Sequence, residues 1–201
     1  MVNLLPARTL DTNSSHDKTG DIEFSRLDAT TWRLRTAQTL PVGRDALFPF
    51  FAAAENLGRI TPPELSFQIL TPTPVAMRAG ALIDYRIQLW RVPMRWRTAI
   101  AEWAPPVEFV DVQLIGPYSE WVHRHRFTAI SADRTLVEDD VRFRLPLGRV
   151  GLVAAPLVRS QLRRIFAYRQ QAIAQLTSGR RSGNDDSFPV GRDGYGARPG
   201  R

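Results

Sequence analysis

Between residues 31 and 145 the chain consists largely of short segments in which apolar and polar residues alternate. This period of two residues predicts β-strands over residues 31–40, 65–70, 81–90, 94–103, 108–115, 120–130 and 135–145. Prolines, glycines and aspartates separate the last six segments at hairpin spacing. Because connections this short join neighbouring antiparallel strands, the pattern predicts an antiparallel meander.

Helical patterns flank the meander. Residues 44–55 hold a cluster of leucine, phenylalanine and alanine that predicts a short helix despite Pro49, and residues 56–60 predict a further helical turn. After residue 148 apolar side chains recur every three or four positions, which predicts a long amphipathic helix over residues 152–176. This order of elements predicts an α+β fold in which the long helix covers the apolar face of a curved sheet.

The 201 residues predict one domain with two tails. Residues 1–27 are mostly polar, and residues 177–201 are rich in glycine and arginine. Both tails are expected to be disordered, because they cannot bury enough apolar surface to offset the entropy lost on ordering. The folded domain is therefore expected over residues 28–176.

Composition excludes several classes of function. The chain has no cysteine, which removes disulfide frameworks, thiolate nucleophiles and cysteine-ligated metal centres. No apolar run is long enough to span a bilayer and no apolar leader follows the first residues, so a cytoplasmic protein is expected, with transient membrane contact left open. The net charge of +7 comes almost entirely from arginines that alternate with apolar residues on the predicted strands. This pattern is typical of a solvated outer face and disfavours nucleic-acid binding.

Residues 121–127, with the sequence WVHRHRF, contain two of the three histidines, two positions apart. On a strand, Trp121, His123, His125 and Phe127 share one face, and the residues between them form a mostly cationic opposite face. An inward face made only for packing would carry valine, isoleucine or leucine. The segment therefore indicates an interior that receives a ligand.

Strand alternation also predicts which neighbours share that interior. Its aromatic members would bury the apolar part of a guest, and its carboxylate, amide and imidazole groups would recognise the guest's polar end. The predicted ligand-binding residues are Tyr85, Trp96, Thr98, Phe109, Asp111, Gln113, Trp121, His123, His125, Phe127, Asp139 and Phe143.

Several interpretations of the polar members remain open. They can form a buried hydrogen-bonded network, since buried polar groups need partners, or they can orient a ligand. Asp111, His123 and His125 are also candidate catalytic residues, because an imidazole beside a carboxylate can move protons near neutral pH. The His-x-His spacing is compatible with zinc or iron(II), but it recurs by chance, so neither a metal nor a cofactor is predicted. Arg169, on the long helix, can face a ligand carboxylate, but a surface salt bridge is the favoured interpretation.

Seven segments resemble a bacterial branch of the SRPBCC superfamily that is described as ligand-binding. They lie at residues 61–67 (TPPELSF), 80–85 (GALIDY), 96–103 (WRTAIAEW), 109–118 (FVDVQLIGPY), 121–127, 139–148 (DDVRFRLPLG) and 165–169 (IFAYR), and the resemblance covers residues 30–176. It implies the START-like helix-grip fold, in which a curved antiparallel β-sheet wraps around a long C-terminal α-helix, with two short helices after the first strand.

The same resemblance implies a function. Such folds hold a hydrophobic or amphipathic small molecule, such as a lipid, an isoprenoid or a polyketide-like compound, in a cavity between the sheet and the C-terminal helix. The related polyketide cyclases imply an alternative, in which a dehydratase-like enzyme uses a His/Asp acid–base pair in the same cavity. Of the two, binding without turnover is favoured.

Overall fold

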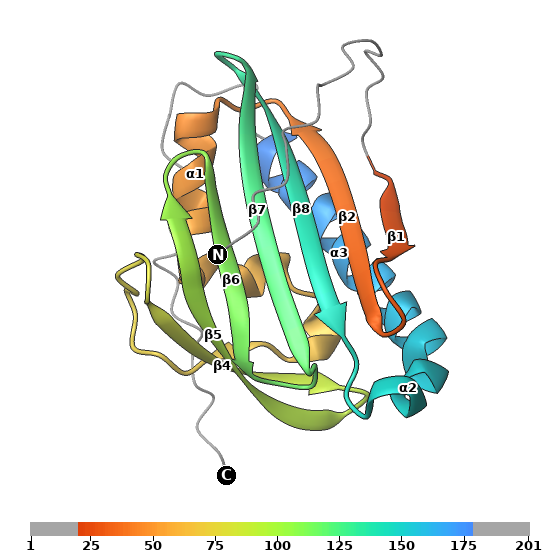
Figure 1. Ribbon diagram of the computed structural model, residues 1–201. Helices are drawn as coiled ribbons and strands as arrows, with labels where there is room; N and C mark the ends of the chain where they lie inside the picture. The colour runs from red at the N-terminus through yellow and green to blue at the C-terminus, as the bar shows by residue number, and fades with distance from the viewer. Residues whose placement is uncertain (1–19, 179–201) are drawn as a thin grey trace, which may run out of the picture.

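The computed structural model of the protein describes residues 20–178, which contain one eight-stranded antiparallel sheet (Figure 1). From β3 to β8 each strand pairs with the next in sequence, and β2 pairs with β8, giving the order β1-β2-β8-β7-β6-β5-β4-β3. The predicted meander is therefore confirmed. The strands are β1 (Ile22–Arg26), β2 (Thr31–Leu40), β3 (Gln68–Ile69), β4 (Leu82–Leu89), β5 (Val92–Ala104), β6 (Glu108–Ile115), β7 (Glu120–Ser131) and β8 (Arg134–Arg144).

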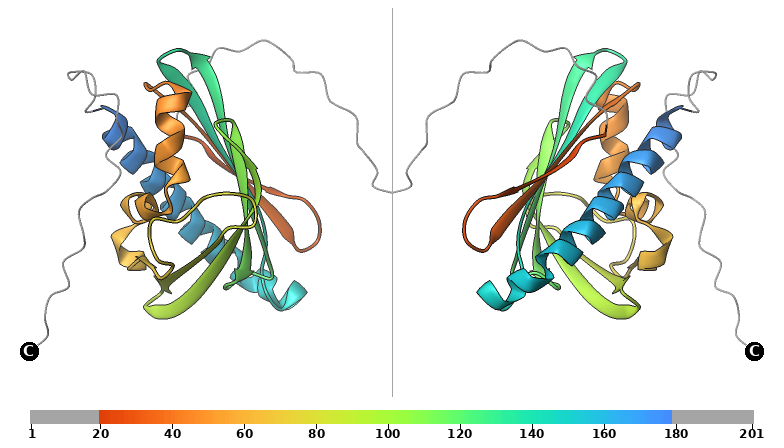
Figure 2. Two further views of the ribbon diagram at one scale, coloured as in Figure 1. Left: turned by 90° about the vertical axis from the view of Figure 1, so that its left-hand side faces the viewer. Right: turned by 90° about the vertical axis from the view of Figure 1, so that its right-hand side faces the viewer.

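Helices α1 and α3 and the short helical turns after α1 lie on one side of this sheet, which we call its inner face (Figure 2). In Figure 1 the long helix α3 lies behind β7, β8 and β2, and Figure 2 shows it crossing the sheet at an angle. Pro156 lies in the first turn of α3, where its missing N–H leaves no helical hydrogen bond unmade. None of the described helices combines the length and apolar character needed to cross a membrane. The helices are α1 (Arg44–Ala52), η1 (Ala54–Ile60), η2 (Pro63–Leu65), α2 (Gly148–Gly151), η3 (Leu152–Ala154) and α3 (Ala155–Ser178).

Two predicted boundaries differ from the structure. The N-terminal tail was predicted over residues 1–27, but residues 22–26 form β1, which pairs with β2. Ile22 and Phe24 supply little apolar surface, and the guanidinium of Arg159 on α3 lies 5.3 Å from the centre of the Phe24 ring, adding a cation–π contact. The long helix spans residues 155–178 rather than 152–176. Residues 1–19 and 179–201 lie outside the described residues.

The strand predicted over residues 65–70 is also shorter than expected. Only Gln68 and Ile69 pair with β4, and the residues before them form η2. Ser66 ends η2 with a φ of 45°, in the left-handed region, so the chain turns there instead of extending.

The core consists of two apolar clusters separated by polar side chains. One cluster gathers around α1 and includes Phe127, and the other gathers around the first half of α3 and includes Trp121. Along β7, His123 and His125 lie between these two aromatic residues, and all four side chains are buried. The strand thus passes from one apolar cluster, through a polar region, into the other.

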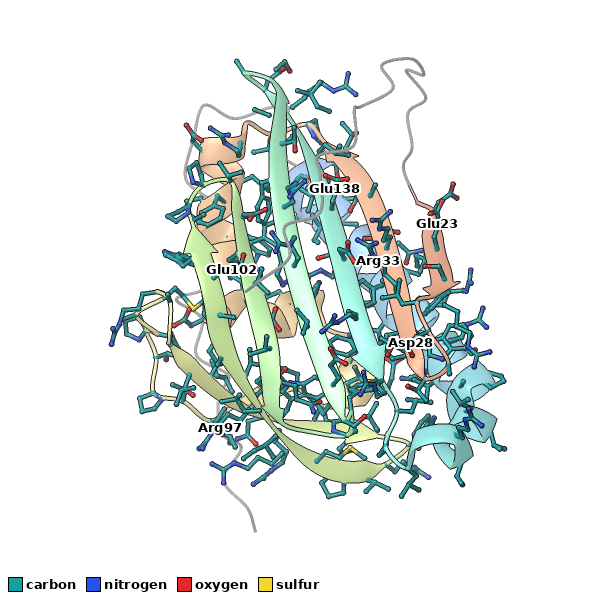
Figure 3. The ribbon with its side chains drawn as sticks, viewed as in Figure 1. Glu23, Asp28, Arg33, Arg97, Glu102 and Glu138 are labelled. Atoms are coloured by element: carbon teal, nitrogen blue, oxygen red, sulfur yellow. The ribbon has the colours of Figure 1, made fainter. Side chains whose placement is uncertain are left out.

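The outer face of the sheet carries arginines paired with carboxylates from neighbouring strands. Arg33 pairs with Asp140, Arg97 lies 2.9 Å from Asp84, and other arginines contact Glu108 and Glu120. Figure 3 shows Arg33 and Glu138 on the side of the sheet opposite α3. The predicted solvated cationic face is confirmed, and cross-strand partners offset much of its charge.

Candidate functional site

A cavity of about 180 Å³ lies between the inner face of the sheet, α3 and the short helices. Most of its wall is apolar or aromatic. Strands β4 to β7 supply one side, η1 and the end of α1 supply another, and Leu162, Ile165, Phe166 and Arg169 of α3 close it. Aromatic residues with a few polar groups are the usual composition of a small-molecule pocket.

Eight of the twelve residues predicted to bind a ligand line this cavity. They come from four adjacent strands, and their alternation places them on the inner face, as the sequence pattern indicated. These residues are Tyr85, Trp96, Thr98, Phe109, Asp111, Trp121, His123 and His125.

The other four predicted residues do not line the cavity. Phe127 is fully buried against α1, with ring centroids 4.9 Å from Phe51 and 5.3 Å from Phe48. Phe143 is likewise a core residue, packed against Trp121. Both point to the inner face as predicted, but other side chains lie between them and the cavity.

Gln113 has a local structural role rather than a position in the polar group. Its Nε2 donates a 2.7 Å hydrogen bond to the backbone oxygen of Tyr118, which ties down the turn between β6 and β7. A side chain at Gly116 would clash with Gln113, so the glycine makes room for this bond. The side-chain amide of Gln113, which strand alternation assigned to the cavity, is therefore bound to the turn instead.

The remaining polar side chains form a cluster that we call the polar band, consisting of Thr36, Asp111, His123, His125 and Asp139. It crosses four neighbouring strands, because Thr36 pairs with Asp139, Asp139 with His125, and His123 with Asp111 in the strand register. Asp139 does not line the cavity but lies against both histidines. The band thus has an inner carboxylate, Asp139, and a carboxylate at the cavity, Asp111.

Each histidine contacts both carboxylates. His123 Nε2 lies 3.0 Å from Asp139 Oδ1, and its Nδ1 lies 3.7 Å from Asp111 Oδ2. His125 Nε2 lies 2.8 Å from Asp111 Oδ2, and its Nδ1 lies 3.0 Å from Asp139 Oδ1. The centres of the two imidazole rings are 3.7 Å apart. This arrangement brings the predicted catalytic candidates Asp111, His123 and His125 together.

Arg169 joins the polar band from α3, so the predicted surface salt bridge is wrong. Its side chain is only 12% exposed, its Nε lies 3.5 Å from Asp139 Oδ2, and its Nη2 lies 3.4 Å from His125 Nδ1. The guanidinium also lies 5.6 Å from the centre of the Phe51 ring. A heptad-like pattern marks which helix positions are apolar, but it does not tell which arginine of an arginine-rich helix turns inward.

The charges of the band follow from its contacts. Burial by itself would raise the pKa of Asp139, but Arg169 and the two histidines hold that pKa well below its ordinary value. Burial would lower the pKa of His125, yet hydrogen bonds to Asp111 and Asp139 outweigh it and raise the pKa. Burial and the neighbouring His125 lower the pKa of His123. The contacts therefore favour the anionic form of Asp139, and they make His125 more basic than His123.

Tyr85 and Thr98 add a second polar contact on the cavity wall. The tyrosine hydroxyl lies 3.4 Å from Thr98 Oγ1, and its ring stacks on Trp96 with an interplanar angle of 15°. Burial raises the pKa of Tyr85, so its hydroxyl stays neutral and can both donate and accept. The cavity wall therefore offers neutral hydroxyl groups from Tyr85 and Thr98 as well as the charged groups of the polar band.

Asp111, His123 and His125 also present one ligand atom each within 4.8 Å of one another, a grouping that can hold a metal ion. Both histidines and the carboxylate line the cavity, so an ion there would face any bound molecule.

No protein-family model and no curated protein matches the chain. Solved structures do match. They include the Zhui aromatase/cyclase from Streptomyces sp. R1128, at 13% identity and a TM-score of 0.55 over 75% of this chain and 98% of that one. A START superfamily protein from Mycobacterium smegmatis matches at 12% identity and a TM-score of 0.57, over 73% of this chain and 97% of that one.

Norcoclaurine synthase from Thalictrum flavum matches at 12% identity and a TM-score of 0.58, over 78% of this chain and all of that one. At such low identities, likeness of structure concerns the fold and not the chemistry. The order of elements agrees with it, with the short helices α1, η1 and η2 after β2 and a long C-terminal helix across the inner face. The chain therefore has the START-like helix-grip fold.

Proposed function

We propose that the protein binds one compact amphipathic molecule in the cavity between the sheet and α3. The observation that carries this proposal is an aromatic cavity whose polar groups gather at the polar band. The ring faces of Trp96, Trp121 and Phe166 would cover the apolar part of the guest. Asp111, the two histidines and Arg169 would bind a carbonyl, hydroxyl or carboxylate at its other end.

The volume narrows the class of guest. Since one water occupies about 10–15 Å³ of such space, a cavity of 180 Å³ accepts roughly a dozen water-sized groups. That is below the approximately 300–1,000 Å³ of pockets for drug-sized ligands. A ring compound of the polyketide or short isoprenoid type therefore suits the site better than a lipid with long acyl chains.

Native mass spectrometry of the protein purified from its own host, followed by extraction, tests the proposal. A small aromatic or isoprenoid compound bound at one molecule per chain is the expected result. For a defined probe, 2-naphthol should quench the fluorescence of the tryptophans in the cavity wall.

A substitution that fills the cavity tests directly whether the probe binds there. Leu162 is buried and lines the cavity, whereas Leu157 lies five residues earlier on the same helix and is 57% exposed. Leu162→Trp should weaken 2-naphthol binding at least tenfold, and Leu157→Trp should leave it unchanged. Equal binding by both variants, each folded by circular dichroism, would refute binding in this cavity.

A second candidate function is an acid–base enzyme of the polyketide cyclase or dehydratase type. The observation in its favour is that both imidazoles face the cavity with a carboxylate in hydrogen-bonding range, at 3.0 Å for His123 and 2.8 Å for His125. The test is incubation of the extracted compound with the native chain and with His123→Ala and Asp111→Asn. Turnover that both variants lose while they retain the ligand supports an enzyme, and no turnover by the native chain excludes it for that compound.

A further inference from the structure

The polar band has an unbalanced charge when both of its histidines are neutral. It contains two carboxylates, Asp111 and Asp139, and among the described residues one guanidinium, Arg169, contacts it. These side chains are 16%, 6% and 12% exposed, so water screens them poorly. A buried charge without a partner is costly. One more positive charge would balance the band, and either a proton or a metal ion can supply it.

The geometry of the three cavity-facing residues suits a metal ion. Asp111 Oδ2 lies 2.8 Å from His125 Nε2 and 3.7 Å from His123 Nδ1, and all three ligand atoms lie within 4.8 Å of one another. Metal–ligand bonds of about 2.0–2.2 Å place neighbouring ligand atoms about 3.0–3.5 Å apart. The two separations from Asp111 lie on either side of this range, and all three atoms lie within 4.8 Å of one another, so side-chain rotations would be needed to bring them around one ion.

The opposite nitrogens have the support that metal-bound histidines require. Histidines that bind a metal donate their other ring N–H to a carboxylate or carbonyl, which fixes the tautomer. Asp139 Oδ1 lies 3.0 Å from His123 Nε2 and 3.0 Å from His125 Nδ1. Thr36 Oγ1 donates to Asp139 Oδ2 at 3.3 Å and holds that carboxylate in place. Without an ion, the 2.8 Å contact between His125 Nε2 and Asp111 Oδ2 is a hydrogen bond that holds a proton. With both N–H groups toward Asp139, the two histidines can turn lone pairs toward an ion that takes the place of this proton.

We propose that Asp111, His123 and His125 form a binding site for a divalent transition-metal ion of the zinc or iron(II) type. Two imidazole nitrogens and one carboxylate oxygen suit these ions better than magnesium or calcium, which prefer oxygen ligands alone. Three protein ligands leave at least one position open toward the cavity, where an oxygen atom of the guest can bind. This inference deepens the proposed function at the polar end of the cavity. Only the binding of a guest oxygen to the metal ion rests on the proposed function.

The test uses the full chain, treated with a chelator and then freed of it, without any organic ligand. Titration with Co²⁺ is followed by visible absorption, and titration with Zn²⁺ by calorimetry. The expected result is one ion per chain, cobalt bands of a site with nitrogen and oxygen ligands, and loss of binding in His123→Ala and His125→Ala. Asp139→Asn should weaken binding by roughly 10–100-fold, because it removes the carboxylate that orients both histidines.

Asp140→Asn is the matched control, since it makes the same exchange one residue later on the outer face, where Asp140 pairs with Arg33. It should bind both ions like the native chain. If a histidine variant does not fold, the near-isosteric Asp111→Asn replaces it and should also lose binding. The inference is overturned if the folded native chain binds neither ion saturably, or if folded His123→Ala and His125→Ala both bind one ion as tightly as it does.

These outcomes separate the metal site from the proposed function. Binding of 2-naphthol to the chelator-treated chain tests the cavity alone, and ion binding tests the three ligands alone. A chain that binds the probe but no ion retains the proposed function without the metal. Metal binding also excludes proton transfer by the same two nitrogens, so a bound ion argues against the acid–base enzyme.

Discussion

Replacing Asp139 by asparagine should destabilise the fold far more than the same exchange at the next residue. The Asp139 side chain is 6% exposed and contacts both histidines at 3.0 Å, Thr36 at 3.3 Å and Arg169 at 3.5 Å. Asparagine keeps the shape but removes the charge, and this leaves the guanidinium of Arg169 buried without its carboxylate. Breaking a buried pair in this way costs about 3–5 kcal/mol.

The ion pair of Asp140 on the outer face gives the loss of stability with which the loss at Asp139 is compared. Asp140 and its partner Arg33 are 28% and 32% exposed, and a surface pair of this kind contributes up to about 1 kcal/mol. In a domain of this size one kcal/mol shifts the melting temperature by about 2–4 °C. Asp139→Asn should therefore lower the melting temperature by roughly 6–20 °C, and Asp140→Asn by at most roughly 4 °C.

Thermal and urea unfolding of both variants, with a chelator in every sample, measures this difference. The double variant Asp139→Asn/Arg169→Met is the internal check, because it removes the stranded charge together with its partner. It should recover part of the lost stability, which would appear as a coupling free energy in a double-mutant cycle. Equal losses for the two asparagine variants, or a double variant that simply sums the single losses, would refute the charge argument.

Three further predictions concern residues outside the cavity. Phe127→Ala should cost about 3–5 kcal/mol in urea unfolding, because the ring is fully buried among other aromatic rings; a loss below about 1 kcal/mol would contradict its role in the core. Gln113→Ala should cost about 1 kcal/mol and raise hydrogen exchange at the turn before Tyr118, whereas unchanged exchange would show that its side chain does not hold the turn. Asp28 accepts backbone hydrogen bonds from Thr30 and Thr31, and these, led by the one from Thr30, lower the pKa of Asp28 to about 2. Because the folded pKa is lowered, the stability that native protein has over Asp28→Ala should be complete above about pH 4 and vanish as pH falls through about 2; a difference that stays constant over that range would exclude the carboxylate.

The sequence predicted the faces of the strands well, because side-chain direction on a strand follows from position alone. Alternation assigned Trp121, His123, His125 and Phe127 to one face, and the structure buries all four. Alternation carries no information about depth, however. It could not tell that His123 and His125 reach the cavity while Phe127 fills the space beneath α1.

The errors arose where long-range or local contacts decide. Gln113 was assigned to the cavity because its hydrogen bond to Tyr118 depends on the shape of a turn, which alternation does not describe. Arg169 was assigned to the surface because several arginines share α3, and only the docking angle of the helix selects the one that meets Asp139. Strand β1 was missed because it has few apolar residues of its own. Two of its contacts with the rest of the domain are cation–π contacts of the Phe24 ring with arginines of α3, which lie more than 130 positions away.

The polar band also bears on how the strands find their partners during folding. A slip of two residues between β7 and β8 would keep every side chain on its correct face, so apolar patterning alone penalises it weakly. In the native register His125 is opposite Asp139 and Phe127 is opposite Val137. A two-residue slip in one direction would place Asp139 against Phe127 and bury a carboxylate beside an aromatic ring. A slip in the other direction would place His125 against Val137 and remove it from its position opposite Asp139. The buried charges of this sheet thus favour the native strand register over shifted registers that the pattern of hydrophobic residues alone would tolerate.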